Sequence, residues 1–222
     1  MSGIIHLILK FKKMNRIPKI LTDLVDDLKY ANLIAEGNVN GEGRVASLVD
    51  EENITEWIKS HPKWSKYYIE VPARKPGDFY LRDYEDDLIH VINIKTTKGT
   101  TDNATSMVGF IYALTDLSIE ELPTFATEKT LLEYVSKRGA DIPNKDYWFL
   151  TFNKNNMNDV FIRGSKQIVN WKSNPSNKLQ INWSKEWKTE YPNYSYEEST
   201  ENIIGGLKEV WEKVKQKMPA DW

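Results

Sequence analysis

The chain has 222 residues, of which 40% are hydrophobic and 28% charged, and its formal net charge is −2. This composition is typical of a soluble globular protein, so we expect one domain over residues 1–222 with a single well-buried core. It contains no cysteine, which excludes disulfides, thiolate zinc sites and a cysteine nucleophile. The three histidines have no spacing that would pair two of them on a metal, so a metal site would depend on oxygen ligands.

The N-terminus carries a short apolar run, residues 4–9, that is broken by His6. It has neither a basic segment before it nor a small-residue cleavage site after it, and no stretch of the chain approaches the roughly 18 apolar residues of a membrane span. We therefore expect a cytoplasmic protein with no membrane partner. Residues 1–13 are either an upstream extension or a poorly ordered strand, and the sequence does not decide between these readings.

The first predicted elements are two helices and a β-hairpin. Apolar spacing predicts helices over residues 17–34 and 47–60, separated by a loop rich in glycine and asparagine. A short aromatic and β-branched run predicts a strand at 67–71. The hairpin follows, with arms at 79–82 and 88–96 joined by an acidic turn. Its second arm is apolar enough to be buried on both faces.

The rest of the chain mixes helices and strands. Helices are predicted at 107–117, 131–138 and 196–218, and strands at 147–152, 160–162 and 179–183. Gly205 and Gly206 fall inside the last helix, and because glycine is unfavourable there we expect a kink or break. Strands alternating with helices indicate an α/β fold, with residues 154–222 forming a decorated C-terminal third of the domain.

Basic residues are concentrated between Lys154 and Lys188, where seven lysines and arginines accompany two acidic residues. The segment is a candidate DNA-facing surface, because phosphate contacts need clustered positive charge. The alternative is an ordinary solvated face rich in lysine.

The predicted hairpin contains the candidate catalytic residues Asp78, Asn93 and Lys95. Asn93 and Lys95 are two positions apart on a strand, so their side chains share one face. An acid on one strand, with an acid and a lysine on the next, can hold a divalent metal beside a phosphodiester and orient the attacking water. The alternative is that Asp78 caps a turn and Lys95 is solvated. That reading leaves Asn93 unexplained, because asparagine is unfavourable in an apolar strand.

This stretch resembles the PD-(D/E)XK nuclease core, and in detail the type II restriction endonucleases of the EcoRV and HincII kind. The run Asp-Phe-Tyr-Leu at 78–81 matches the first arm of the motif. The run Ile-Asn-Ile-Lys-Thr-Thr at 92–97 matches the second arm, with Asn93 in place of an acid. A second departure is Gly77, which separates Pro76 from Asp78. The resemblance covers roughly a third of the chain and reaches upstream to residues 35–37.

The resemblance implies a restriction-endonuclease-like core, a mixed central β-sheet flanked by helices. It implies a Mg²⁺-dependent type II enzyme that hydrolyses double-stranded DNA sequence-specifically and leaves 5′-phosphates. Asp78 and Asn93 would be the metal ligands and Lys95 the catalytic lysine, and Glu51 would add a further catalytic carboxylate, with Glu52 as the rival choice. Such enzymes work as homodimers on palindromic sites.

Asn93 lowers the expected activity, because a neutral amide attracts a hard cation less than a carboxylate does. Either the natural chain has aspartate at this position and the acid has been replaced, or the chain is a naturally degenerate relative. The alternatives to a restriction enzyme are therefore a DNA-binding protein with a degenerate nuclease site, or a repair or junction-resolving nuclease.

DNA recognition is expected from polar loops near the hairpin and in the C-terminal third. Asparagine can form two hydrogen bonds with adenine, although it is also a common turn residue. The residues expected to contact DNA are Thr96, Thr97, Lys98, Asn170, Lys172, Ser173, Asn174 and Asn177. The turn at 153–158 is a further candidate.

Overall fold

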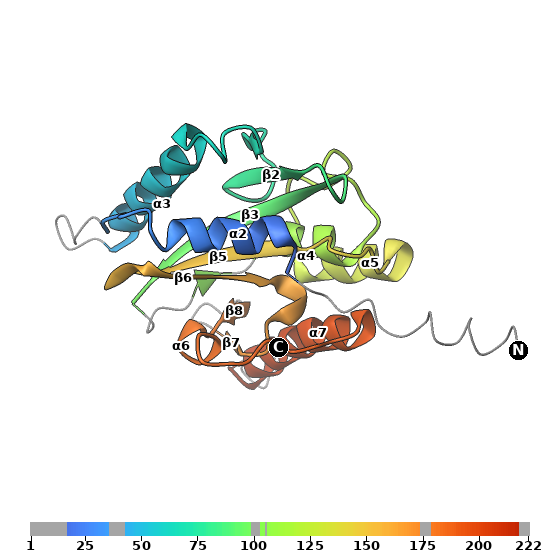
Figure 1. Ribbon diagram of the computed structural model, residues 1–222. Coiled ribbons are helices and arrows are strands. Elements are labelled where there is room, and N and C mark those ends of the chain that lie inside the picture. Colours follow the sequence, from blue (N-terminus) through green and yellow to red (C-terminus); the bar gives the residue numbers. More distant parts are fainter. Residues whose placement is uncertain (1–16, 36–42, 99–102, 105, 174–178, 218–222) are drawn as a thin grey trace, which may run out of the picture.

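The computed structural model describes residues 17–35, 43–98, 103–104, 106–173 and 179–217. Its centre is a five-stranded mixed sheet in the order β1-β2-β3-β5-β6 (Figure 1). The strands are β1 (Tyr68–Ile69), β2 (Phe79–Asp83), β3 (Leu88–Thr97), β5 (Tyr147–Asn153) and β6 (Asn156–Gly164). The only parallel pairing in this sheet is β3 with β5, and the other neighbours run antiparallel.

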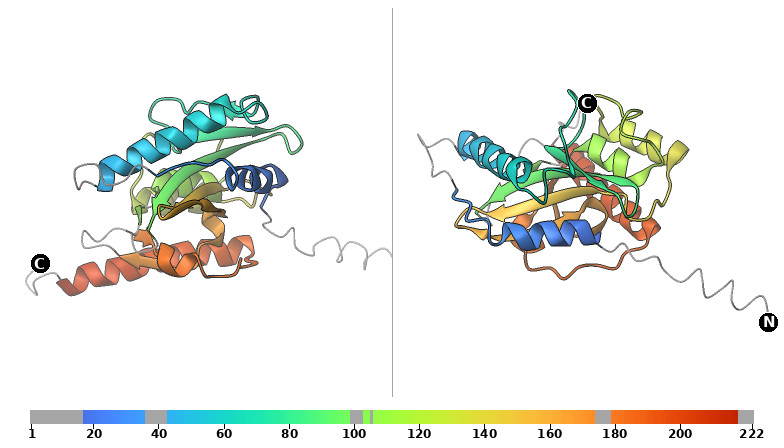
Figure 2. Two further views of the ribbon diagram at one scale, coloured as in Figure 1. Left: turned by 60° about the vertical axis from the view of Figure 1, so that its left-hand side comes forward. Right: turned by 45° about the horizontal axis from the view of Figure 1, so that its top comes forward.

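Helices cover both faces of this sheet. On one face lie α2 (Lys19–Leu28) and α3 (Gly43–Ser60), and on the other lie α4 (Met107–Leu114), α5 (Glu128–Arg138) and α7 (Tyr196–Lys217). The left view of Figure 2 shows α3 and α7 on opposite sides of the sheet. The predicted α/β class, with a mixed central sheet flanked by helices, is therefore confirmed. The arrangement is consistent with the restriction-endonuclease-like core that the resemblance implies.

The C-terminal third adds a second layer of structure beneath the sheet. A small antiparallel sheet joins β4 (Asn103–Ala104), β8 (Leu179–Ile181) and β7 (Trp171–Ser173). Between β6 and β7 lies the short 3-10 helix η2 (Ser165–Gln167), and α6 (Trp183–Glu186) follows β8. Trp183, which the sequence placed at the end of a strand, instead begins this helix.

The two faces of the hairpin strands pack into different cores. Ile92 and Ile94 are fully buried on the side of α2 and α3, whereas Val91 packs on the side of α4. Since side chains alternate along a strand, Asn93 and Lys95 share the face of Val91. The prediction that β3 is buried on both faces, with Asn93 and Lys95 side by side, matches the structure.

Helix α7 is continuous through Gly205 and Gly206, so the predicted break is absent. A Cβ built on Gly206 would lie 2.9 Å from Trp171 Cγ, whereas one on Gly205 meets nothing within 4 Å. Gly206 is therefore the position where α7 approaches the small sheet closely, and close packing compensates for the low helix propensity of glycine.

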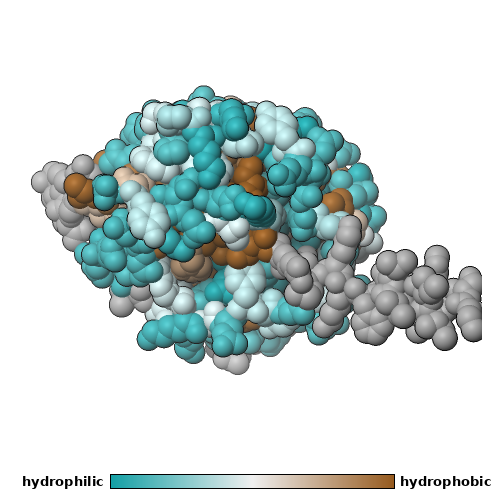
Figure 3. Space-filling view, viewed as in Figure 1, coloured by the Kyte–Doolittle hydropathy of each residue, from teal (hydrophilic) through white to brown (hydrophobic). Residues whose placement is uncertain are grey.

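Helix boundaries also differ from the prediction near the N-terminus. The first helix ends at Leu28, and Asn32 then adopts a left-handed conformation with φ 51° that turns the chain away. Within the described ranges, no helix combines the length and the apolar character needed to cross a membrane. Figure 3 shows a largely hydrophilic face on which hydrophobic residues gather in small patches.

Candidate active site

Asp78 lies immediately before β2 and is held against β3 by three hydrogen bonds. Its backbone N–H donates to Ile92 O (2.8 Å), and its Oδ2 accepts from Ile94 N (2.5 Å) and from Asn93 Nδ2 (2.9 Å). The predicted juxtaposition of Asp78 and Asn93 on adjacent strands is therefore present in the structure.

Gly77 explains why a residue separates Pro76 from the acid. Its φ is +97°, a conformation that side chains rarely adopt, and a Cβ there would lie 2.9 Å from Val91 Cγ1 and 3.0 Å from Ile92 O. Only glycine lets the backbone pass this close to β3. The departure from the family motif thus serves the placement of Asp78.

The charges around Asp78 oppose one another. Burial raises the pKa of the Asp78 carboxyl above its usual range, while the positive charge of Lys95 and the hydrogen bond from Ile94 N act to lower it. Lys95 is half-buried and follows Asn93 by two positions on the same face of β3. Lys95 and the Ile94 N–H thus partly offset the effect of burial on the Asp78 carboxyl.

Glu51 is the acid that α3 contributes to the site. Burial raises its pKa to about 7, the positive charge of Lys95 opposes this rise, and the negative charge of Asp78 adds to it. The charges of both residues therefore act on the Glu51 carboxyl. Glu52, by contrast, is exposed. The structure thus favours Glu51 over Glu52 as the third acidic position.

Sequence reasoning missed a polar anchor beside Glu51. Asp50 is only 1% exposed, and its Oδ2 lies 3.4 Å from Lys154 Nζ, which also donates to Ser47 Oγ at 2.7 Å. The backbone N–H of Lys154 donates to Thr97 O at 2.8 Å. Lys154, which begins the β5–β6 turn, therefore ties that turn to both α3 and the end of β3.

The positions of Asp50, Ile54 and Ile58 along α3 indicate that Asp50 is buried and needs a partner such as Lys154. The buried row of the helix is Asp50, Ile54 and Ile58, at intervals of four, whereas Leu48 is 59% exposed. The spacing of Leu48, Glu51, Ile54 and Ile58 in the sequence predicts one shared face. The exposure of Leu48 contradicts this prediction, because the row that packs on the sheet is displaced around the helix. A carboxylate aligned with two buried isoleucines requires a partner, and that partner is Lys154.

The oxygen-bearing side chains near the hairpin are of types that Mg²⁺ accepts as ligands. Asp78 and Glu51 offer carboxylate oxygens and Asn93 an amide oxygen, and Mg²⁺ needs few protein oxygens because it keeps several waters. Within the described ranges, no group of three or more histidine, aspartate and glutamate side chains is arranged to hold a metal ion. The neutral residue at position 93 leaves the site one carboxylate short.

The residues expected to contact DNA fall into three groups. Thr96 and Thr97 are 5% and 0% exposed in β3, and Asn170 Nδ2 donates to Glu186 Oε2 (2.9 Å) and Thr189 Oγ1 (2.8 Å). Burial and these bonds argue against DNA contacts by the three side chains. Exposed positions are Lys98 and Lys172. The side chain of Ser173, and all of Asn174 and Asn177, lie outside what the structure describes.

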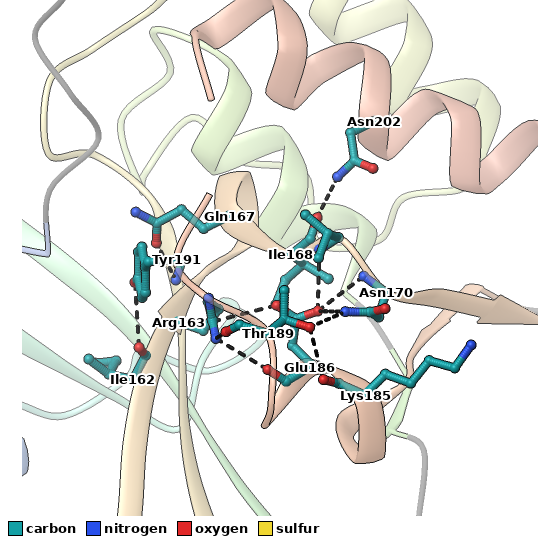
Figure 4. A network of polar contacts seen from close by, with 12 residues as sticks. Ile162, Arg163, Gln167, Ile168, Asn170, Lys185, Glu186, Thr189, Tyr191 and Asn202 are labelled. Carbon is teal, nitrogen blue, oxygen red and sulfur yellow. Dashed lines mark hydrogen bonds and ion pairs between the residues drawn. The ribbon is translucent and has the colours of Figure 1, made fainter. Parts of the chain in front are cut away.

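The basic segment 154–188 is not a continuous surface, which corrects the sequence-based hypothesis. Arg163 and Lys166 are 4% and 1% exposed. Arg163 Nη2 donates to Glu186 O and Thr189 O, and its Nε lies 3.5 Å from Glu186 Oε1 (Figure 4). Arg163 therefore joins β6 to α6 inside the protein, because the fully buried Glu186 supplies the opposite charge.

No protein-family model matches the chain, and no curated protein matches it.

Proposed function

We propose that this chain is a nuclease of the PD-(D/E)XK type, a type II restriction endonuclease that hydrolyses double-stranded DNA with Mg²⁺ and leaves 5′-phosphates. The observation that carries the proposal is the convergence of Asp78, Asn93 and Lys95 at the β2–β3 hairpin, within electrostatic reach of Glu51. The mixed sheet presents these residues together from neighbouring elements.

Each residue has a chemical role in this proposal. Asp78, Glu51 and the amide oxygen of Asn93 would hold Mg²⁺, which when bound would stabilise the charge that develops on the phosphate. Lys95 orients the attacking water and offsets negative charge beside it. The side-chain amide of Asn93 donates a hydrogen bond to Asp78 Oδ2. A bound metal would compete with this hydrogen bond for the same carboxylate oxygen.

The partners follow from the same proposal. Each chain carries one candidate active site, so cutting both strands of a palindrome calls for a homodimer with two-fold symmetry. A reducing cytoplasm is the compartment we propose, since the chain contains no cysteine.

A second candidate is a DNA-binding protein with a degenerate nuclease site. It is favoured by the Asn93–Asp78 hydrogen bond, which satisfies the carboxylate internally. In this candidate the chain binds DNA and does not cut it, even when the acid at position 93 is supplied.

The test is plasmid cleavage in Mg²⁺ by the chain and by its Asn93→Asp variant. We expect the chain to be nearly inactive and the variant to cut at defined sites, because the added carboxylate completes the metal-binding set. Asn193→Asp makes the same charge change at an exposed loop position and should stay inactive. Adding Asp78→Asn to the Asn93→Asp variant should abolish cleavage. A folded Asn93→Asp protein that never cuts DNA would refute the enzyme proposal.

A further inference from the structure

A groove lies between the segment after α2 and the turn that joins β5 to β6. Residues 32–35 form one wall and residues 154–158 the other, and the groove encloses about 520 Å³. Its lining mixes asparagine side chains with the apolar residues Leu33, Ile34 and Met157. The large hydrophobic side chain of Ile34 is 83% exposed at its rim.

Two asparagines shape the turn and two others face outward. Asn153 Oδ1 accepts from Asn155 N (3.0 Å), and Asn156 Oδ1 accepts from Asn158 N (3.2 Å). The side chains of Asn155 and Asn158 are exposed, and in the part of the chain that the structure describes their amides make no hydrogen bond. The turn thus presents two amide groups, each with a donor and an acceptor, from a backbone that is already ordered.

The groove is connected to the candidate active site through Lys154. This residue lines the groove, contacts Asp50 and Ser47 on α3, and bonds to Thr97 at the end of β3. Thr97 follows Asn93 by four residues on one strand, a distance of roughly 13 Å. On a DNA duplex this distance corresponds to about four base-pair steps.

The lining indicates the chemical class of the ligand. A side-chain amide matches the adjacent donor and acceptor on the major-groove edge of adenine, and apolar side chains contact the methyl group of thymine. Phosphate binding is a poorer match, because Lys154, the one cation among the described residues of the lining, is paired with Asp50. Leu33 and Ile34 supply the apolar part, whereas Met157 is only 5% exposed.

We propose that this groove reads the major-groove edge of A·T base pairs that flank the phosphodiester at the candidate active site, with Asn155 and Asn158 as the specificity-determining residues. The proposal rests on the proposed nuclease function, since it identifies which part of that substrate the protein reads. Lys154 is a positioning residue here, because it ties the reading turn to the helix that carries Glu51.

The experiment selects bound duplexes from a random-sequence DNA library, using the full chain in Mg²⁺. We expect the chain to enrich A·T pairs at fixed positions. The double variant Asn155→Ala with Asn158→Ala should lose roughly tenfold or more of the preference at those positions, and retain its affinity for unrelated duplex DNA. The matched control Asn193→Ala removes an exposed asparagine elsewhere and should select the same sequences as the parent.

Two further measurements separate the possible outcomes. Asn155→Gln with Asn158→Gln keeps both amides but displaces them, so this variant should also change which DNA sequences are selected. An unchanged thermal unfolding midpoint in both double variants shows that the fold is intact. The same changes on the Asn93→Asp background are scored by cleavage. Cleavage whose sequence preference is unchanged overturns the groove proposal and supports the nuclease. Selection that depends on the amides, with no cleavage, supports the groove and overturns the nuclease. A chain that binds no duplex DNA overturns both.

Discussion

Replacing Glu51 with glutamine tests the geometry of the candidate site without any substrate. The pKa of this carboxyl is raised from its usual 4.5 to about 7, chiefly by burial. The folded protein therefore holds the Glu51 proton more tightly than the unfolded chain does. That preference contributes stability below pH 4.5, and the contribution is lost as the pH rises through 7.

The size of the effect follows from the same pKa. A change from 4.5 to about 7 corresponds to about 3 kcal/mol at about 1.4 kcal/mol per pH unit. The carboxyl is only partly buried, so solvent screening reduces the expected value to about 1–2 kcal/mol. Glutamine is close in shape to the protonated acid, so Glu51→Gln should be more stable than the parent by this amount at pH 8 and about equally stable near pH 4.5.

The assay is urea unfolding of parent and variant at several pH values between 4.5 and 8.5. The difference in unfolding free energy should grow with pH and level off above pH 7. Glu52→Gln removes the neighbouring exposed carboxylate and should show no such growth. A Glu51→Gln difference that is independent of pH, or an equal slope for Glu52→Gln, would show that Glu51 does not occupy the partly buried position that raises its pKa.

Two further substitutions test the packing of the C-terminal third. Gly206→Ala should destabilise the protein by about 1–3 kcal/mol, because the added Cβ would collide with the indole of Trp171. Gly205→Ala should stabilise it by about 0.5–1 kcal/mol, because a Cβ there meets no atom within 4 Å. Thermal unfolding of both variants measures these effects, and equal effects would contradict the close approach of α7 to the small sheet at Gly206. Glu186→Gln should cost about 2–4 kcal/mol, since it leaves a buried guanidinium without its counter-charge. The exposed Glu190→Gln should change urea unfolding by less than about 0.5 kcal/mol, and a mild Glu186→Gln would mean that the buried ion pair is not structurally important.

Much of the central hairpin could be predicted from local sequence. The alternation of side chains along a strand depends on backbone geometry alone, so Asn93 and Lys95 were assigned to one face without knowledge of the fold. The order of strands and helices likewise indicated an α/β protein. The position of Asp78 against Asn93 followed from the shortness of the hairpin turn, which leaves few registers for the two arms.

The surroundings of the hairpin could not be predicted in this way. Arg163 and Lys166 belong to a basic segment, yet they are buried because Glu186 and Asp141 lie near them in space and not in the local sequence. Helix periodicity put Glu51 on the face of Leu48. The structure shows instead that Asp50 occupies the buried row, held by a lysine more than a hundred residues away.

The amino-acid sequence by itself determined the strand pair, the shared face of Asn93 and Lys95, and the acid beside them, because these depend on residues close together along the chain. Only the tertiary structure decided that the charges of Asp78 and Lys95 act on Glu51, that Lys154 links α3 to the asparagine-rich turn, and that Thr96 and Thr97 are buried. Those outcomes depend on which distant elements pack together, and the burial of a charge becomes favourable only when its partner arrives from another element.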